Sequence, residues 1–168
     1  RVWIGTNGGK VASWLDRNGL HQLNLMAGTD SVVIKDILED SRGNIWFATR
    51  AGLNKFDGHS FTLFDLPKLQ KGIAHEVGRY FVTSLAEDQQ NRMWIGTLTG
   101  LFVYDLTEDT IDVFEWNEKD TTSLSNNLVE FVVVDKSNNI WVGNQNGLNK
   151  YNAEKKNFVR FLHSPIDY

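Results

Sequence analysis

The chain of 168 residues contains no cysteine, so a fold held together by disulfide bonds is excluded. It also has no excess of positive charge: the net charge is −4, which gives no electrostatic footprint for nucleic acid or an anionic membrane. No segment approaches the roughly 20 apolar residues that cross a bilayer. No signal peptide is visible, and this says nothing about export if the chain is a fragment. A hydrophobic content of 41% is enough for a sizeable core.

Recognisable catalytic and metal-binding motifs are also missing. The patterns GxSxG, GxxxxGK[ST] and GxGxxG do not occur. The histidines, at positions 21, 59, 75 and 163, have neither i,i+4 spacing nor cysteine partners for a metal. Asp135 to Asn139 begins like a calcium loop, but position twelve of that loop is Asn146 instead of a bidentate acid. We therefore expect no catalytic residue, no metal and no cofactor in this segment.

What the sequence does contain is a repeat marked by tryptophan. Four related segments begin at Trp3, Trp46, Trp94 and Trp141, and they read WIGT, WFAT, WIGT and WVGN. The gaps between the tryptophans are 43, 48 and 47 residues. Periods of about 40–50 residues with a tryptophan in each copy are typical of β-propeller blades.

Other positions recur in the same register. An aspartate lies six residues before three of the tryptophans, at Asp40, Asp88 and Asp135. The residues that follow each aspartate are rich in Asn, Ser, Gln and Gly, as in hairpin turns. Each of the four tryptophans is followed six residues later by a glycine, at Gly9, Gly52, Gly100 and Gly147.

A small residue stands two positions after every tryptophan, as Gly5, Ala48, Gly96 and Gly143. A small residue in the middle of a strand marks close approach of a neighbour. We expect adjacent blades to pack tightly here, with the tryptophan filling the gap between their sheets. Gly96→Val should then destabilise the protein through overpacking, by about 1–3 kcal/mol.

The apolar runs between the turns are short and predict strands. Residues 32–65 divide into strands at 33–39, 44–49, 53–56 and 61–65, and the last strands of the later units are expected at 111–116 and 158–161. The runs 34–38 and 129–134 are apolar enough to be buried on both faces. Residues 68–79 read as a loop with one helical turn. The predicted class is all-β.

The predicted architecture is a β-propeller with about three complete four-stranded blades and a partial first blade. The complete blades are expected at 32–66, 80–116 and 128–162, and the partial blade at 1–25. Propellers need four to eight blades to close their ring. We therefore expect a piece of a larger ring, and closure by a second copy of the chain, as a homodimer, stays an alternative.

The repeat resembles a known family. The pattern D-x-x-G-x-[IL]-W-[IV]-G-T-x-x-G-L-x-x-[YF] is similar to the two-component regulator propeller repeat. It runs here from Asp40 to Phe56, from Asp88 to Tyr104 and from Asp135 to Tyr151. The segment 121–127, TTSLSNN, also looks like the family's connector between blades. The departures are Lys10 in place of leucine, Ala48 in place of glycine and Asn144 in place of threonine.

The resemblance implies a seven-bladed ring in the periplasmic sensor region of a Bacteroides-type hybrid two-component system. Such a region belongs to an inner-membrane protein, binds an oligosaccharide and controls a downstream histidine kinase. It implies that this segment binds a ligand and is not an enzyme, that the membrane is reached only through the parent protein, and that nucleic acid is not a partner.

In a propeller, the loops after each second strand emerge on one face, together with the longer connections at 67–80 and 117–127. Their amide, hydroxyl and basic groups suit sugar hydroxyls. The candidate ligand-binding residues are Asn7, Arg50, His75, Arg79, Tyr80, Thr97, Thr99, Asn144 and Gln145. The basic groups of 67–80 favour an acidic sugar, although a solvated loop with ordinary lysines fits equally well. Arg50 is the first choice, because the sister loops carry small or polar residues there.

Two alternatives remain open at this point. One is a propeller that only docks a protein partner, through exposed residues such as Leu98, Trp116 or Trp14. The other is a propeller lyase or hydrolase, whose active site would gather residues from distant blades. It would need an acid/base pair or a metal at the ring axis, which this segment does not supply by itself.

Overall fold

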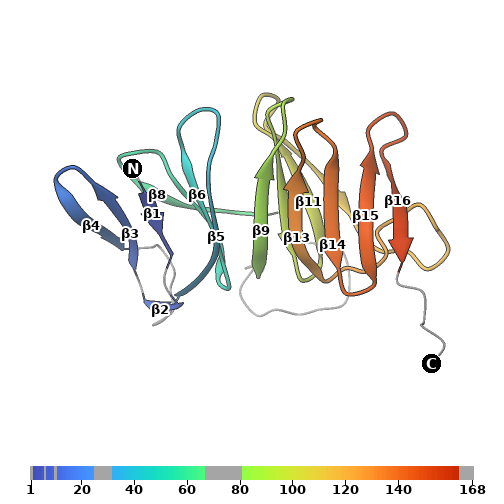
Figure 1. Ribbon diagram of the computed structural model, residues 1–168, viewed down its shortest axis with the longest axis horizontal. Helices are drawn as coiled ribbons and strands as arrows, with labels where there is room; N and C mark the ends of the chain where they lie inside the picture. Colours follow the sequence, from blue (N-terminus) through green and yellow to red (C-terminus); the bar gives the residue numbers. More distant parts are fainter. Residues whose placement is uncertain (1, 6, 10, 25–31, 67–80, 163–168) are drawn as a thin grey trace. The chain divides into compact units, whose positions relative to one another are not determined.

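The computed structural model describes residues 2–5, 7–9, 11–24, 32–66 and 81–162, and these form strands and turns without a helix (Figure 1). Accordingly, the described residues include no helix long and apolar enough to cross a membrane. The chain divides into two compact units, residues 1–83 and 84–168. The loop with a helical turn that we expect at 68–79 lies outside the described residues.

The first unit holds two antiparallel sheets. The smaller sheet has the order β1-β3-β4 and consists of β1 (Val2–Ile4), β3 (Val11–Asp16) and β4 (Gly19–Asn24). The larger has the order β2-β5-β6-β7-β8 and consists of β2 (Asn7–Gly9), β5 (Val32–Glu39), β6 (Ile45–Thr49), β7 (Gly52–Phe56) and β8 (Phe61–Phe64). The first sheet has three strands, as a partial blade requires.

The second unit holds two four-stranded meanders. One consists of β9 (Val82–Glu87), β10 (Arg92–Thr97), β11 (Gly100–Asp105) and β12 (Thr110–Phe114). The other consists of β13 (Val129–Val134), β14 (Ile140–Asn144), β15 (Gly147–Asn152) and β16 (Asn157–Leu162). In both, each strand pairs with the next in sequence, as in a propeller blade.

The predicted strands of 32–65 agree with β5 to β8 to within a residue at each end. Two predictions need correction. Asn7 is not in a loop: it pairs with Val33 of β5, so β2 extends the second sheet to five strands. The predicted strand 111–116 ends at Phe114, because the chain then turns away and Trp116 makes an isolated parallel bridge to Leu124.

The recurring aspartate closes the first hairpin of each complete blade. Asp40, Asp88 and Asp135 each accept a hydrogen bond from the indole Nε1 of the tryptophan six residues later, at 2.7, 2.8 and 3.0 Å. The third residue after each aspartate has a positive φ, at 80°, 59° and 61° for Gly43, Asn91 and Asn138. Gly and Asn tolerate this conformation best, which explains the composition of the turn.

Two of the repeat tryptophans, Trp94 and Trp3, pack between sheets as predicted, whereas Trp141 lies on the outer face of the last sheet. Trp94 is fully buried in the second unit's core, together with Leu101 of its own blade and with Val132, Val142 and Tyr151 of the next. In the first unit, Trp3 packs edge-on against Phe47 of the second sheet, with ring centroids 5.5 Å apart.

The small residue after the tryptophan has two different neighbours. A side chain at Gly5 would meet Ile34 Cγ2 of the next sheet at 2.9 Å, so adjacent blades approach closely there, as expected. A side chain at Gly143 would instead collide with the ring of Phe131, which belongs to the same sheet.

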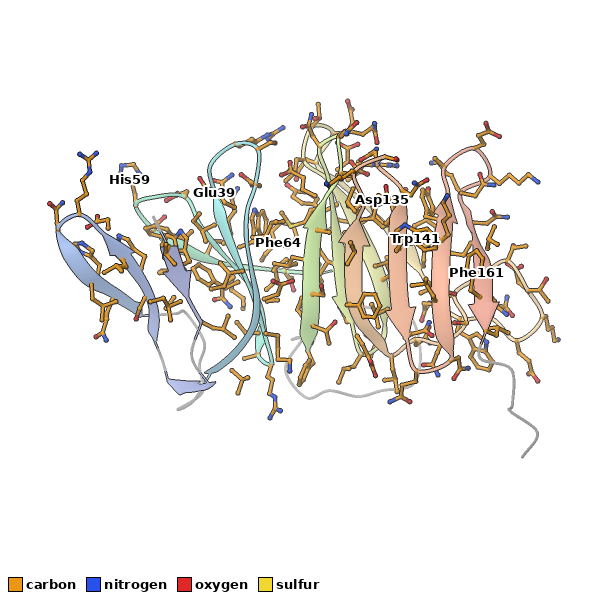
Figure 2. The ribbon with its side chains drawn as sticks, viewed as in Figure 1. Glu39, His59, Phe64, Asp135, Trp141 and Phe161 are labelled. Atoms are coloured by element: carbon orange, nitrogen blue, oxygen red, sulfur yellow. The ribbon has the colours of Figure 1, made fainter. Side chains whose placement is uncertain are left out.

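The prediction that 129–134 is buried on both faces is wrong. Val129 and Val132 are buried, but Phe131 and Val133 are 45% and 48% exposed. The outer face of this sheet also carries Trp141 and Phe161, with ring centroids 5.9 Å apart (Figure 2). Among the described residues no further sheet covers this face, so its apolar side chains stay in contact with solvent.

Candidate functional site

The predicted ligand-binding loops are the turns that follow β6, β10 and β14, and their first residue serves the turn itself. Thr49 Oγ1 donates a hydrogen bond to the Gly52 carbonyl at 2.6 Å and accepts one from the Ala51 amide at 3.1 Å. Thr97 does the same with Gly100 at 2.8 Å and Thr99 at 3.1 Å. Both threonines are fully buried. Their hydroxyl groups therefore shape the turns.

In the last blade Asn144 takes the place of this threonine. Its Oδ1 accepts from the Asn146 amide at 3.1 Å, which reproduces the threonine contact. Its amide also reaches the connector between blades, because Oδ1 accepts from Ser125 Oγ at 2.8 Å and Nδ2 donates to the Asn126 carbonyl at 3.0 Å. Asn144, which stands where the other blades have threonine, thus links the turn to the connector through Ser125 and Asn126.

Other candidates remain accessible. Gln145 is exposed, and Thr99 is half-buried with its hydroxyl 3.2 Å from that of Thr97. Arg50 is exposed, and its guanidinium lies 5.4 Å from the centroid of the Phe81 ring, a cation–π contact. Asn7 lies in β2, and His75, Arg79 and Tyr80 lie outside the described residues. The structure therefore brings Thr97 and Thr99 together in one turn and Asn144 and Gln145 in another.

A loop from residue 115 to 128, called the connector from here on, lies beside the turn after β14, and it is fixed by a residue that the sequence analysis missed. Arg160 of β16 donates Nε to the Ser123 carbonyl at 2.8 Å. Its Nη2 donates to the Asp120 and Leu124 carbonyls at 2.8 and 2.7 Å. An arginine in an outer strand gives no local sequence signal for this role, because its partners lie 36–40 residues away.

Asn149 of β15 holds the other end of the connector and was also missed. It is fully buried; its Oδ1 accepts from the Ser125 amide at 2.9 Å and its Nδ2 donates to the Val142 carbonyl at 3.1 Å. The equivalent side chain in the second blade is Asn54, also fully buried, for which the described residues provide no hydrogen-bond partner. A recurring asparagine after Gly-Leu is the signal that could have pointed to this position.

The carboxylates of the repeat are charged structural groups. Hydrogen bonds from Trp141 and then Asn139 lower the pKa of the Asp135 carboxyl to about 2. Burial raises the pKa of the Asp40 carboxyl, but hydrogen bonds from Trp46 and Asn44 outweigh burial and leave the pKa lowered. These acids stay ionised and bonded to their own turns, which does not suit them to donate protons in catalysis.

The tryptophan segments with their aspartate turns match a family model. Residues 28–51 and 77–99 match the model described as two component regulator propeller. The chain therefore contains two segments that match the two component regulator propeller model. The matched ranges contain the Asp40–Trp46 and Asp88–Trp94 pairs, which are the hydrogen-bonded elements described above.

Solved structures with the same repeat fold come from B. thetaiotaomicron. The extracellular domain of a hybrid two component system is 26% identical, with a TM-score of 0.66, over 77% of this chain and 18% of that chain. The extracellular domain of a one component system is 21% identical, with a TM-score of 0.70, over 90% of this chain and 20% of that chain. This chain therefore spans about a fifth of the length of these two proteins.

An enzyme shares the fold. Virginiamycin B lyase from Staphylococcus aureus is 14% identical, with a TM-score of 0.71, over 98% of this chain and 52% of that chain. At this identity the likeness concerns the propeller fold alone. No curated protein matched the chain.

Proposed function

We propose that this chain is part of the ligand-sensing region of a two-component signalling protein. The match to the two component regulator propeller carries the proposal, and the likeness to an extracellular domain of a hybrid two component system supports it. In this proposal the region lies in the periplasm, belongs to an inner-membrane protein and controls a histidine kinase elsewhere in that protein. The segment itself binds and does not catalyse.

The ligand that we propose is an oligosaccharide, bound at the turns after the second strands. Sugar hydroxyls are both donors and acceptors, and amide side chains can pair with them in either role. Exposed Gln145 offers such an amide in the second unit, next to Asn146, whose own amide is bonded to Ser125 and Asn126. Exposed Arg50 offers a cation in the first unit, which suits an acidic sugar.

A thermal-shift screen with defined acidic and neutral oligosaccharides tests this proposal. A bound sugar should raise the melting temperature in proportion to the logarithm of its concentration, because it binds only the folded chain. Arg50→Ala should abolish the shift caused by a sugar bound at the first unit, and Gln145→Ala the shift caused by a sugar bound at the second. Each variant should leave the melting temperature of the free protein unchanged.

The matched control is Arg42→Ala. Arg42 is also exposed but lies in the turn before β6, whereas Arg50 lies in the turn after it. This variant should retain the full shift. A folded protein that responds to no sugar in the panel, or an Arg50→Ala variant with unchanged affinity, contradicts the proposal.

The apolar outer face of the last sheet favours a second function, self-association. The corresponding positions one repeat earlier, Ala86 and Phe114, pack in the core beneath β13–β16, whereas Val133 and Phe161 are exposed. Another sheet of this repeat could therefore cover the apolar outer face of β13–β16, and a second copy of the chain would provide such a sheet.

Phe161→Lys should shift a dimer toward monomer in analytical ultracentrifugation, and Leu20→Lys, an exposed position in β4, should not. A wild-type protein that stays monomeric at all concentrations excludes this association.

A further inference from the structure

An open hollow of about 510 Å³ lies beside the connector in the second unit. Its walls are the end of β12, connector residues 115–124 and the chain around the start of β16. This volume falls in the range of roughly 300–1,000 Å³ that is common for small-ligand sites. None of the described candidates at the turns lines it, so it is a separate place on the molecule.

Trp116 gives the hollow an exposed aromatic surface. The residue is 46% exposed, although its backbone is fixed: its amide donates to Asn127 Oδ1 at 2.6 Å and the residue bridges to Leu124. Leu124 and Phe158, which also line the hollow, are buried and belong to the core. The tryptophan is therefore held in place while a large part of its surface remains open to a ligand.

The charges around this tryptophan are mainly negative. Glu115, Glu118 and Asp120 line the hollow, and Lys156 is the one cation among the described residues that line it. Asp120 Oδ1 accepts from the amide and the hydroxyl of Thr122 at 2.8 and 2.7 Å. The side chains of Glu115 and Glu118 have no hydrogen bond or ion pair to any described residue, so their carboxylates are free to meet a cation.

The connector is organised before any ligand arrives. Ser123 Oγ accepts from the Asn117 amide at 2.8 Å, and Arg160 Nη2 donates to the same hydroxyl at 2.7 Å. The Ser123 amide donates to the Asp120 carbonyl at 3.2 Å, which closes the turn. A wall that is already ordered loses little conformational entropy on binding, which favours affinity for a small ligand.

The same contacts disfavour an extended peptide as the occupant. A peptide that adds to a sheet needs a free strand edge. Here the connector takes that place, because the Phe158 amide of β16 donates to the Thr122 carbonyl at 2.8 Å and Trp116 is bridged to Leu124. The hollow instead suits a compact ligand that has both a cationic group and an apolar face.

We propose that the hollow binds an amino sugar, a hexosamine unit that carries a free ammonium group. The ammonium lies near the carboxylates of Glu115 and Glu118 and within reach of the Trp116 ring, an aromatic that favours cations strongly. The apolar face of the sugar ring lies against the indole, and the polar groups of Asn117 and Asn157 meet its hydroxyls. The site is distinct from the turns of the proposed function, and its test uses other variants.

The experiment compares β-1,4-linked diglucosamine, which carries two ammonium groups, with its N,N′-diacetyl form, in which uncharged acetamides replace them. Isothermal titration calorimetry with the complete chain should show the free amine binding at least about tenfold more tightly. Its affinity should fall as the ionic strength rises, because exposed charges are screened by salt. Equal affinity for the two sugars, or no binding of the amine, overturns the proposal.

Variants locate the binding within the hollow. Trp116→Ala and Glu118→Gln should each weaken the binding of diglucosamine by about tenfold or more, whereas Glu108→Gln, an exposed acid in the turn after β11, should have no effect. Arg50→Ala should also leave the binding of diglucosamine unchanged. The test of the hollow is therefore independent of the test of the oligosaccharide site at the turns. Unchanged affinity in Trp116→Ala and Glu118→Gln, or equal affinity for trilysine, contradicts the assignment to an amino sugar.

Discussion

The indole Nε1 of Trp94 lies 2.8 Å from Oδ2 of Asp88, six residues earlier in the chain. Trp94 is fully buried between two blades, so its N–H group would lack a partner without this carboxylate. The same carboxylate accepts from Arg92 Nε at 2.8 Å and from the Arg92 amide at 3.0 Å. One side chain thereby fixes the hairpin turn, satisfies the core tryptophan and neutralises a cation.

Asp88→Ala should therefore be strongly destabilising. It leaves a buried indole N–H and a partly buried guanidinium without their acceptor, which we expect to cost about 2–4 kcal/mol. Chemical denaturation monitored by tryptophan fluorescence measures this change. Asp135→Ala is the matched comparison and should cost less, because Trp141 is only partly buried. Equal losses for the two variants would show that burial of the tryptophan does not matter.

The lowered pKa of the Asp135 carboxyl should make the stability of the protein depend on pH. Its pKa is lowered from 3.8 to about 2 by the hydrogen bonds from Trp141 and Asn139. Because the pKa is lower in the folded chain, these bonds favour folding above about pH 4 and lose their effect as the pH falls toward 2. Asp135→Asn should flatten the stability profile between pH 4 and 2 in urea denaturation. A variant whose profile parallels that of the wild-type protein in this window contradicts the assignment.

The third prediction concerns the hydrogen bonds by which Arg160 holds the connector. Arg160→Met keeps a long apolar side chain but removes the donors to the Asp120, Ser123 and Leu124 carbonyls. We expect a loss of about 1–3 kcal/mol, because these acceptors lose charge-assisted bonds. Hydrogen exchange of the Ser123 and Phe158 amides should accelerate more than that of β14. Uniform acceleration over the whole second unit would indicate a general loss of stability instead of a local anchor.

The strands and the aspartate turns could be predicted because they recur at a fixed spacing and depend on neighbours in sequence. Asp135 and Trp141 are six residues apart, so the repeat itself carries the information. The connector contacts could not be found in this way. Arg160 and Ser123 lie 37 residues apart, and a pair that occurs only once does not show up as a repeat in the sequence.

The candidate ligand-binding residues stay a prediction, because a polar residue in a turn can serve either a ligand or the turn itself. Thr97 serves its turn: its hydroxyl donates to the Gly100 carbonyl and accepts from the Thr99 amide. Gln145, the neighbour of Asn144, has the same polarity but no such role in the turn, and it is exposed. Only the backbone geometry distinguishes the two cases.

The repeated asparagine of the third strand gives a fourth prediction. Asn149→Ala removes the partners of the Ser125 amide and the Val142 carbonyl in a buried place, which should cost about 2–3 kcal/mol. Asn54→Ala, at the equivalent position, removes no hydrogen bond to a described residue and should cost at least about 1 kcal/mol less. Thermal and urea denaturation of the two variants measure the difference. Equal costs would indicate that the cavity left by the side chain, and not its hydrogen bonds, determines the loss.

Gly147 gives the last prediction, through the turn that it closes. Its φ is +136°, and a side chain there would collide with the carbonyl oxygen of Phe161 in the neighbouring strand, which is backbone and cannot rotate away. Gly58 also has a positive φ, +95°, but open space around it. Gly58→Ala should therefore cost only the conformational strain, about 1–2 kcal/mol, whereas Gly147→Ala should cost this strain and also displace β16.

The measurement is the free energy of unfolding of both variants, with amide hydrogen exchange in β16 as the local readout. Faster exchange at Phe161 and Leu162 in Gly147→Ala, without a change in β9, is the expected pattern. The two substitutions add the same methyl group at a positive φ, and only the one at Gly147 meets the backbone of Phe161. Equal destabilisation by the two alanines would mean that β16 can shift away from the new methyl group without a loss of stability. Gly147 would then be required only for its backbone conformation.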